Sequence, residues 1–372
     1  MKIIKNLKQL IKNVILKKGF KTNRQIVVFE SDDWGSVRNT NLEDFKTFKS
    51  KHPNFKFDHY QSLDILESDE DVTSLIDVLK KHKDSKGNFA KFTLNFATAN
   101  PDFKKIKESE NSQFIYEPIT ATYQNSKNSK NVINLIKNAI TENVLMPQLH
   151  SREHLNSNML IKSLKENTFV SEAFEYKIIG LDDGNYKGMD CLCNCCQESK
   201  NVLLQDAYEI FEKTFGFKSK TFIAPCYVWS PKDEQVLSNL GVEYLQGKLY
   251  QNIPIAINEY KRKLHKFGEK NKSNNLIYGI RNCQFEPAKE KFTQKTDEQI
   301  LENVLKDIEN AFKNKKPAVI CTHRVNFVGG MCENNRKNNL KLLDKLLSCL
   351  EKKYSNLEYM STDKLLNVIK EK

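Results

Sequence analysis

The sequence has little glycine and proline and no long apolar run. Its 372 residues include 13 glycines and 9 prolines, too few for a collagen-like or low-complexity chain. No apolar stretch approaches the roughly 18 residues that a membrane-spanning helix needs, and the mean hydropathy is −0.60. With 39% hydrophobic and 28% charged residues, these absences predict a soluble globular protein with one large domain or two ordinary ones.

Paired cysteine motifs are missing as well. Five of the nine cysteines are isolated along the chain: Cys226, Cys283, Cys321, Cys332 and Cys349. Isolated thiols suit a reducing compartment better than a disulfide framework. The other four crowd into residues 191–196 (CLCNCC), without the two separated Cys-x-x-Cys halves of a structural zinc site. We interpret this tract as a loop insertion with incidental thiols, and a metal or redox role is the alternative.

The excess of positive charge lies mainly at one end. The formal net charge is +12, and residues 1–24 hold eight lysines and arginines and no acid. No basic motif interleaved with aromatic residues and no zinc-finger spacing accompanies this excess. We therefore expect no nucleic-acid partner.

Residues 1–20 are predicted to form a basic amphipathic helix. Its apolar stripe comprises Ile3, Leu7, Leu10, Ile11 and Val14. Such stripes usually pack on the body of a protein, which we favour; peripheral contact of residues 2–18 with an anionic membrane surface is the alternative. Lysines interrupt every apolar stretch and no small-residue cleavage site follows, so no signal peptide is expected. The expected location is the cytoplasm.

Strand-like and helix-like segments alternate through the rest of the chain. Short apolar runs predict strands at Gln25–Glu30, Phe92–Ala97, Val144–Leu149, Lys220–Ala224, Leu276–Ile280 and Ala318–Thr322. Helical periodicity marks the segment after Ser68 and residues 131–142, 157–167, 202–214, 298–313 and 335–353. A last strand, a Ser/Thr cap and a last helix close the chain. Segments 169–200 and 247–275 have weak periodicity and are interpreted as insertions or loops.

This alternation predicts an α/β fold with a parallel sheet. Periodicity alone does not separate a doubly wound sheet from a barrel. No glycine fingerprint follows the first strand, which disfavours a dinucleotide-binding sheet.

Polar side chains follow four of the predicted strands. Asp32 and Asp33 come after the first, where two adjacent carboxylates repel unless a cation or a division of labour relieves them. His150 and His154 follow another; if a helix begins there, they share a face one turn apart and suit a divalent metal, ordinarily zinc. Ordinary alternatives are an Asp-rich turn closed by Gly35 and a surface histidine pair.

The other two sites are less specific alone. Pro225-Cys226-Tyr227 forms a proline-shaped loop that can aim backbone N–H groups at a developing oxyanion. His323 ends a buried-looking strand, where a lone histidine is more often structural. Active sites of parallel α/β folds gather at the carboxyl ends of strands, where all four sites lie on the predicted map.

The order Ser-Asp-Asp-Trp-Gly, His-Ser-Arg-Glu-His, Pro-Cys-Tyr and strand-terminal His resembles that of the polysaccharide deacetylases, the NodB-homology carbohydrate esterases. The resemblance covers about residues 25–325. It implies a distorted (β/α) barrel of about seven strands in a single domain, residues 21–372, with insertions near 169–200 and 247–275.

The resemblance also implies roles for the site residues. Asp33, His150 and His154 would bind one divalent metal ion, most often zinc in that family. Asp32 would be the general base that deprotonates the attacking water, and His323 would protonate the leaving amine or alcohol. The backbone N–H of Tyr227 would help to hold the oxyanion.

The sequence departs from the family pattern in three places. Trp34 precedes Gly35 in the first motif, and Ala224 occupies the position of the arginine that pairs with the base. No Asp-x-x-Asp-Trp motif lies between Tyr227 and His323. We interpret Arg281 as the replacement guanidinium, with a solvated surface arginine as the alternative.

The sequence thus predicts a metal-dependent hydrolase that removes N- or O-linked acetyl groups from an acetylated saccharide. One alternative is a catalytically impaired deacetylase-fold protein that binds carbohydrate. The other is a metal-dependent amidohydrolase that acts on an amide outside carbohydrates.

Overall fold

The computed structural model describes residues 18–181, 197–256 and 259–371. Most of the predicted amphipathic helix of residues 1–20, including its apolar stripe, and the cysteine tract 191–196 lie outside these residues. Within them, no helix combines the length and apolarity required to cross a bilayer.

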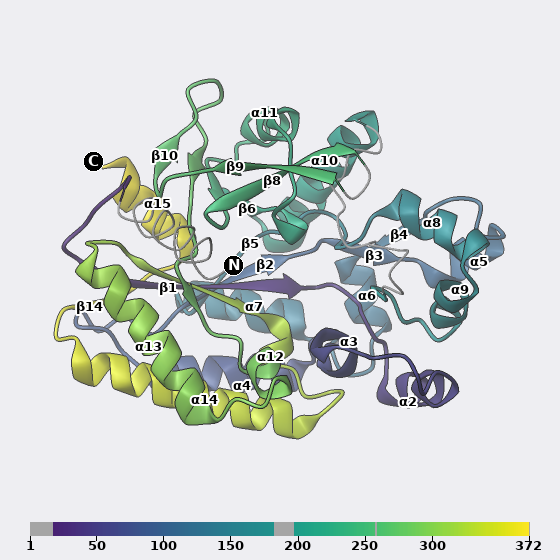
Figure 1. Ribbon diagram of the computed structural model, residues 1–372, viewed down its shortest axis with the longest axis horizontal. Coiled ribbons are helices and arrows are strands. Elements are labelled where there is room, and N and C mark those ends of the chain that lie inside the picture. Colours follow the sequence, from purple (N-terminus) through teal and green to yellow (C-terminus); the bar gives the residue numbers. More distant parts are fainter. Residues whose placement is uncertain (1–17, 182–196, 257–258, 372) are drawn as a thin grey trace, which may run out of the picture.

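One ten-stranded sheet organises the chain (Figure 1). Its order is β10-β11-β7-β6-β5-β2-β1-β13-β12, and β14 pairs with β1. Every pairing is parallel except that of β10 with β11. The strands are β1 (Gln25–Trp34), β2 (Phe92–Phe96), β5 (Leu145–Leu149), β6 (Thr221–Ile223), β7 (Tyr244–Gln246), β10 (Glu269–Lys270), β11 (Ile277–Tyr278), β12 (Cys283–Gln284), β13 (Ala318–His323) and β14 (Leu357–Tyr359).

The segment 277–285 links the two ends of this sheet. Its first half bonds to β7 and to the residues just after it: Ile277 and Tyr278 pair with that strand, and the Arg281 N–H donates to the Gly247 carbonyl. Its second half bonds to β13, where the Asn282 N–H donates to the Val319 carbonyl and β12 is paired. The fold is therefore the predicted α/β type with a parallel-stranded core, curved so that one short segment joins its edges.

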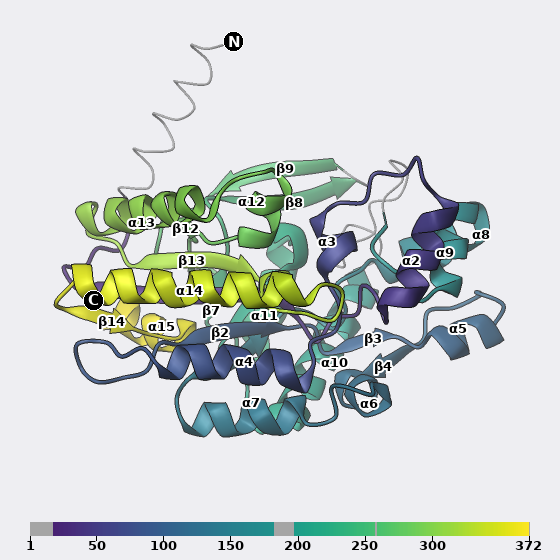
Figure 2. The same cartoon turned by 90° about the horizontal axis from the view of Figure 1, so that it is seen from below.

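Helices cover the outside of the sheet. Figures 1 and 2 show α4, α13 and α14 along one side, with α10 and α11 on another. The main helices are α4 (Asp69–Lys80), α7 (Val132–Thr141), α10 (Gln197–Phe215), α11 (Pro231–Asn239), α13 (Asp297–Lys313), α14 (Glu333–Lys353) and α15 (Thr362–Lys370). Local sequence explains α13: Thr296 and Gln299 form a capping box, and Ile300, Val304 and Ile308 recur on the buried face.

Shorter elements surround the carboxyl ends of the strands. The helices are α2 (Leu42–Lys51), α3 (His59–Leu63), α5 (Phe103–Glu108), α6 (Ile119–Asn125), α8 (Ser157–Glu166), α9 (Thr168–Glu175) and α12 (Pro287–Phe292), with 3₁₀ turns η1 (Pro225–Tyr227) and η2 (Arg324–Asn326). Two antiparallel pairs complete the fold: β3 (Ala99–Pro101) with β4 (Tyr116–Pro118), and β8 (Tyr250–Ala256) with β9 (Glu259–Leu264).

The two segments interpreted as loops contain regular structure. Helix α9 occupies the start of 169–200, and the hairpin β8–β9 occupies much of 247–275. The hairpin was hidden because β9 reads Glu-Tyr-Lys-Arg-Lys-Leu and is mostly exposed on both faces, so it lacks the apolar alternation of a half-buried strand.

Candidate active site

Side chains from five parts of the chain meet around one cavity at the carboxyl ends of the strands. The cavity has a volume of about 280 Å³. Its walls include Asp32, Asp33, Arg38, Tyr60, His150, His154, Ala224, Tyr227 and His323. The predicted site residues therefore share one cavity, apart from Arg281, which bonds to Asp32 from behind.

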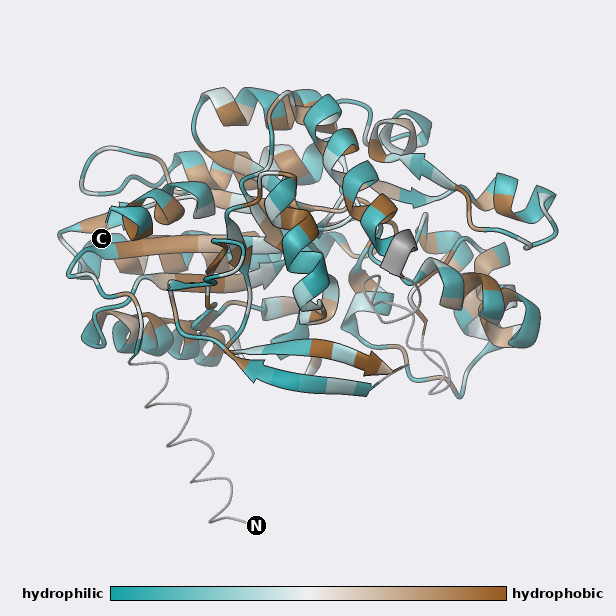
Figure 3. Ribbon diagram, turned by 90° about the horizontal axis from the view of Figure 1, so that it is seen from above, coloured by the Kyte–Doolittle hydropathy of each residue, from teal (hydrophilic) through white to brown (hydrophobic). Residues whose placement is uncertain are grey.

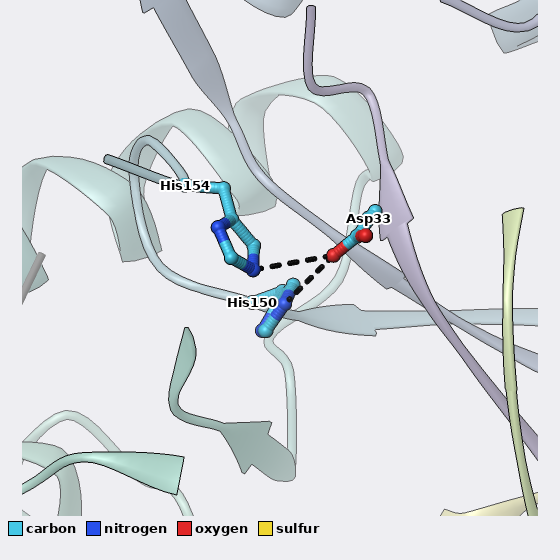
Figure 4. Close-up of side chains that lie close together, drawn as sticks. All are labelled: Asp33, His150 and His154. Carbon is cyan, nitrogen blue, oxygen red and sulfur yellow. Dashed lines mark ion pairs between the residues drawn. The ribbon is translucent and has the colours of Figure 1, made fainter. Parts of the chain in front are cut away.

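Asp33, His150 and His154 form a compact ligand cluster (Figure 4). Asp33 Oδ1 lies 3.5 Å from His150 Nε2 and 3.2 Å from His154 Nε2. Zinc ligands at roughly 2.0–2.2 Å in a tetrahedron are about 3.4 Å apart, so this spacing fits one shared cation. Asp33 Oδ1 and His150 Nε2 are buried without a hydrogen-bond partner among the described residues. A cation would satisfy both atoms, and one carboxylate with two imidazoles is an ordinary zinc donor set.

The two histidines converge from a loop, and no helix begins at His150. Helix α8 begins only at Ser157. The His150 N–H donates to the Phe96 carbonyl across the β2–β5 boundary, and Ser151 has a φ of 71°, which turns the chain out of strand geometry. His150 Nδ1 lies 2.8 Å from the Ile223 carbonyl oxygen. Because only a protonated Nδ1 bonds to a carbonyl, Nε2 is left as the free ligand atom.

The charge of Asp33 is strongly stabilised. Burial raises its pKa, but His154 and the Arg38 guanidinium hold it well below the usual range. Burial also lowers the pKa of His154 to about 3, so its ring is neutral near pH 7 and can act as a ligand. Arg38 Nη2 donates to Asp33 Oδ2 at 3.0 Å, and its Nε lies 2.9 Å from Asp64. A buried guanidinium thus holds the carboxylate from the side that faces away from the histidines.

Asp32 is held by a different arginine. Arg281 Nη1 and Nη2 donate to its two carboxylate oxygens at 2.6 Å each, and Asn95 donates to Oδ1 at 2.8 Å. Burial raises the pKa of Asp32, but Arg281 outweighs this and the pKa falls to about 2. Arg281 also donates to Glu30 at 2.7 Å. Arg281 is therefore a buried ion-pair partner of Asp32 and not a solvated surface arginine.

His323 lines the same cavity as the candidate metal ligands. Its Nδ1 is 2.5 Å from Glu286 Oε1, and its Nε2 is 3.7 Å from Asp32 Oδ2. Burial lowers the pKa of His323, but the Glu286 carboxylate more than offsets this and raises it to about 10. The ring is therefore protonated near neutral pH, with Nε2 directed toward Asp32.

Tyr227 is placed at the site, but its N–H is already used. Cys226 and Tyr227 both have positive φ values in η1, and the Tyr227 N–H donates to the Ala224 carbonyl at 3.0 Å. The oxyanion role expected for this N–H thus has no free donor in this conformation. The Tyr227 hydroxyl instead accepts from Arg281 at 3.2 Å.

Sequence reasoning missed four residues that support the site. Arg38 and Glu286 stand in irregular segments, without a strand to place them. Asn95 on β2 and Gln246 on β7 form hydrogen bonds with each other. Asn95 also donates to Asp32, and Gln246 also accepts from Arg281, so this amide pair holds both members of the ion pair. A polar residue inside the apolar run Phe-Thr-Leu-Asn-Phe was the available signal for Asn95.

No family model matches the sequence, and no curated protein matches it either. Solved structures with similar folds include a mutant with restored activity of a CE4 family pseudoenzyme from Bacillus anthracis (11% identity, 92% of this chain, 68% of that chain, TM-score 0.41). They also include a probable polysaccharide deacetylase from Pseudomonas aeruginosa (7% identity, 93% of this chain, 91% of that chain, TM-score 0.48). A third is the Puue allantoinase (7% identity, 93% of this chain, 90% of that chain, TM-score 0.49).

Proposed function

We propose that this chain is a metal-dependent hydrolase that removes an acetyl group from an acetylated saccharide. The observation that carries the proposal is the position of a metal-ligand cluster, a carboxylate base and a protonated histidine around one cavity. Metal-assisted hydrolysis of an ester or amide uses these three functions together.

Asp32 is proposed as the general base. Arg281 and Asn95 fix its carboxylate, and Oδ2 faces His323 across the cavity. It accepts a proton from the water whose oxygen forms the new bond to the acetyl carbon. Asp33, His150 and His154 would hold a divalent cation, for which we propose zinc, and such a cation would supply Lewis-acid activation of that water.

His323 is proposed as the general acid. Its Nδ1 proton is held by Glu286, so Nε2 carries the proton that the leaving oxygen or nitrogen needs. When the bond from the acetyl carbon to that atom breaks, the saccharide leaves as an alcohol or amine and acetic acid remains, which releases the second proton of the water to solvent and becomes acetate. The proton accepted by Asp32 then restores His323.

We assign the acyl oxygen to Arg38 in place of the Tyr227 N–H. Arg38 lines the same cavity, and its Nη2 and Nε face Asp33 and Asp64. Its Nη1 makes no hydrogen bond to a described residue, so it is an available donor for an oxygen that gains negative charge.

Metal analysis and acetate release test the proposal together. Wild type should bind one zinc per chain and release acetate from acetylated saccharides, and His154→Ala should lose both. His52→Ala is the matched control, because this histidine pairs with Glu172 away from the cavity and should leave both unchanged. Equal metal content in wild type and His154→Ala would refute the ligand assignment.

The same assay separates the alternatives. Metal and saccharide binding without acetate release would indicate an impaired carbohydrate-binding protein. Hydrolysis of simple acetamides but of no acetylated saccharide would indicate an amidohydrolase outside carbohydrates.

A further inference from the structure

A second and larger cavity adjoins the catalytic one. Its volume is about 750 Å³, within the range of ligand pockets. His323 and Tyr60 line both cavities, so these two side chains stand at the boundary between them. Their rings contact each other edge to face at a centroid distance of 5.5 Å.

The position of His323 identifies which part of a substrate the larger cavity receives. A general acid contacts the oxygen or nitrogen atom that leaves, within about 3 Å. The acetyl group lies on the metal side of that atom, so the rest of the leaving group extends past His323. In the proposed reaction, the larger cavity is therefore the place of the saccharide.

The charges of this cavity are unbalanced toward positive. Arg281 is compensated by Asp32 and Glu30, and His323 by Glu286. Lys316 donates to the carbonyls of residues 18 and 20. Lys248 and Lys289 are exposed on the cavity wall and form no ion pair with a described residue. The lining contains one further carboxylate, Asp307, so positive groups outnumber negative ones.

The hairpin β8–β9 extends this positive surface. Lys261, Arg262 and Lys263 lie exposed along β9. The hairpin sits at the periphery, where Figure 3 shows β9 as mainly hydrophilic, whereas β8 also carries hydrophobic residues. It is tied to the catalytic loop, because the Asn252 side chain on β8 donates to the Cys226 carbonyl and Lys248 lies 4.3 Å from the centre of the Tyr227 ring.

We propose that the larger cavity binds a saccharide that carries negative charge, as a carboxylate or a phosphate, with Lys248 and Lys289 as the residues that select it. This inference rests on the proposed function for the orientation of the substrate. Neutral saccharides lack the group that these two ammonium ions would pair with.

Direct binding measurements test this without requiring turnover. The probes are an oligogalacturonate, its methyl ester of the same length, and a sugar phosphate, titrated calorimetrically into the zinc-loaded wild type. At low salt, the acid should bind about tenfold more tightly than the neutral ester, as two charge pairs of modest strength would give. The difference should shrink at high salt, because screening weakens exposed pairs.

The double variant Lys248→Gln/Lys289→Gln should bind acid and ester within about twofold of each other. The control Lys341→Gln/Lys345→Gln removes the same charge from two exposed positions on α14 that do not line the cavity, and it should keep the wild-type preference. Equal binding of acid and ester by wild type, or equal loss in both double variants, would overturn the inference. Tighter binding of the sugar phosphate than of the acid would assign the group as phosphate, and the reverse as carboxylate.

The two proposals fail differently. Acetate release from neutral saccharides with no preference for charge would refute the anionic site and leave the hydrolase. Charge-selective binding that depends on Lys248 and Lys289, with no acetate release from any acetylated substrate, would refute the hydrolase and leave the site.

Discussion

Replacing Glu286 by glutamine is expected to move the pKa of His323 from about 10 back toward its ordinary value of 6.5. Glutamine keeps the shape of the side chain and its Oε1 still accepts from Nδ1, but the negative charge is gone. The difference between these two pKa values corresponds to about 5 kcal/mol in favour of the protonated ring. The other groups that face His323 stay in place: Asp32 on β1, Tyr60 on α3 and Cys321 on β13.

The expected consequence for catalysis follows from the sign of this shift. A general acid works in its protonated form, so the rate is retained below its pKa and lost above it. Wild type should keep its activity on an acetylated amino sugar up to about pH 10, whereas Glu286→Gln should lose it above about pH 7. An activated aryl acetate needs little protonation of its leaving group, so its hydrolysis should change much less.

Two measurements check this reasoning. The imidazole resonance of His323, identified by its absence in His323→Ala, gives the pKa directly and needs no substrate. Unfolding by urea gives the linked stability: a raised pKa contributes fully below about pH 6.5, and the contribution disappears as pH rises through about 10. Wild type should therefore lose up to about 5 kcal/mol over that interval and the variant much less. An unchanged His323 titration in Glu286→Gln would refute the account of this pair.

Three further changes probe the same site. Arg281→Met leaves two buried carboxylates without their partner and should lower the free energy of unfolding in urea by about 3–5 kcal/mol. The control Lys337→Met breaks an exposed ion pair and should cost at most about 0.5 kcal/mol. Equal losses in the two variants would contradict the burial argument. Asp32→Asn should keep its metal and lose most hydrolysis, and a metal-free protein would show that Asp32 is itself a ligand. Gly279→Ala places a Cβ 2.1 Å from the buried hydroxyl of Tyr244. The clash should lower the free energy of unfolding by about 1–3 kcal/mol and lower kcat, because it moves Arg281. In the control Gly247→Ala the new Cβ makes ordinary contacts at 3.5 Å, and neither effect is expected.

Much of the sheet could be predicted from short apolar runs. Each of the six predicted runs overlaps a strand of the sheet. β1 extends further than expected, through Trp34, because Asp32 still pairs with His323 on β13 and Trp34 pairs with Phe96 on β2. β7 was missed because three residues, Tyr-Leu-Gln, do not make a periodic pattern. The parallel sheet could be predicted because strand-like and helix-like segments alternate along the sequence. The crossing of segment 277–285 could not, because it depends on hydrogen bonds to two strands that are distant in the sequence.

The proposed site residues were easier to predict from the sequence than the residues that position them. Asp32, Asp33, His150, His154 and His323 follow apolar strands, so a strand map alone places them at one edge. Partners such as Arg38 and Glu286 reach the site from loops. Their position is set by long-range packing, and no periodicity in the sequence encodes it.

Arg281 shows how a buried carboxylate is balanced by a cation from a distant part of the sequence. Asp32 is buried, and its ionised form needs a cation in contact whichever strand provides it. The residue at position 224 is alanine, which is too small to contribute one. The segment 277–285 passes next to the same carboxylate as it crosses from β7 to β13, so an arginine there reaches both oxygens. The charge of Asp32 is thus balanced by a residue far away in the sequence, and the crossing of segment 277–285 from β7 to β13 brings the two side chains together.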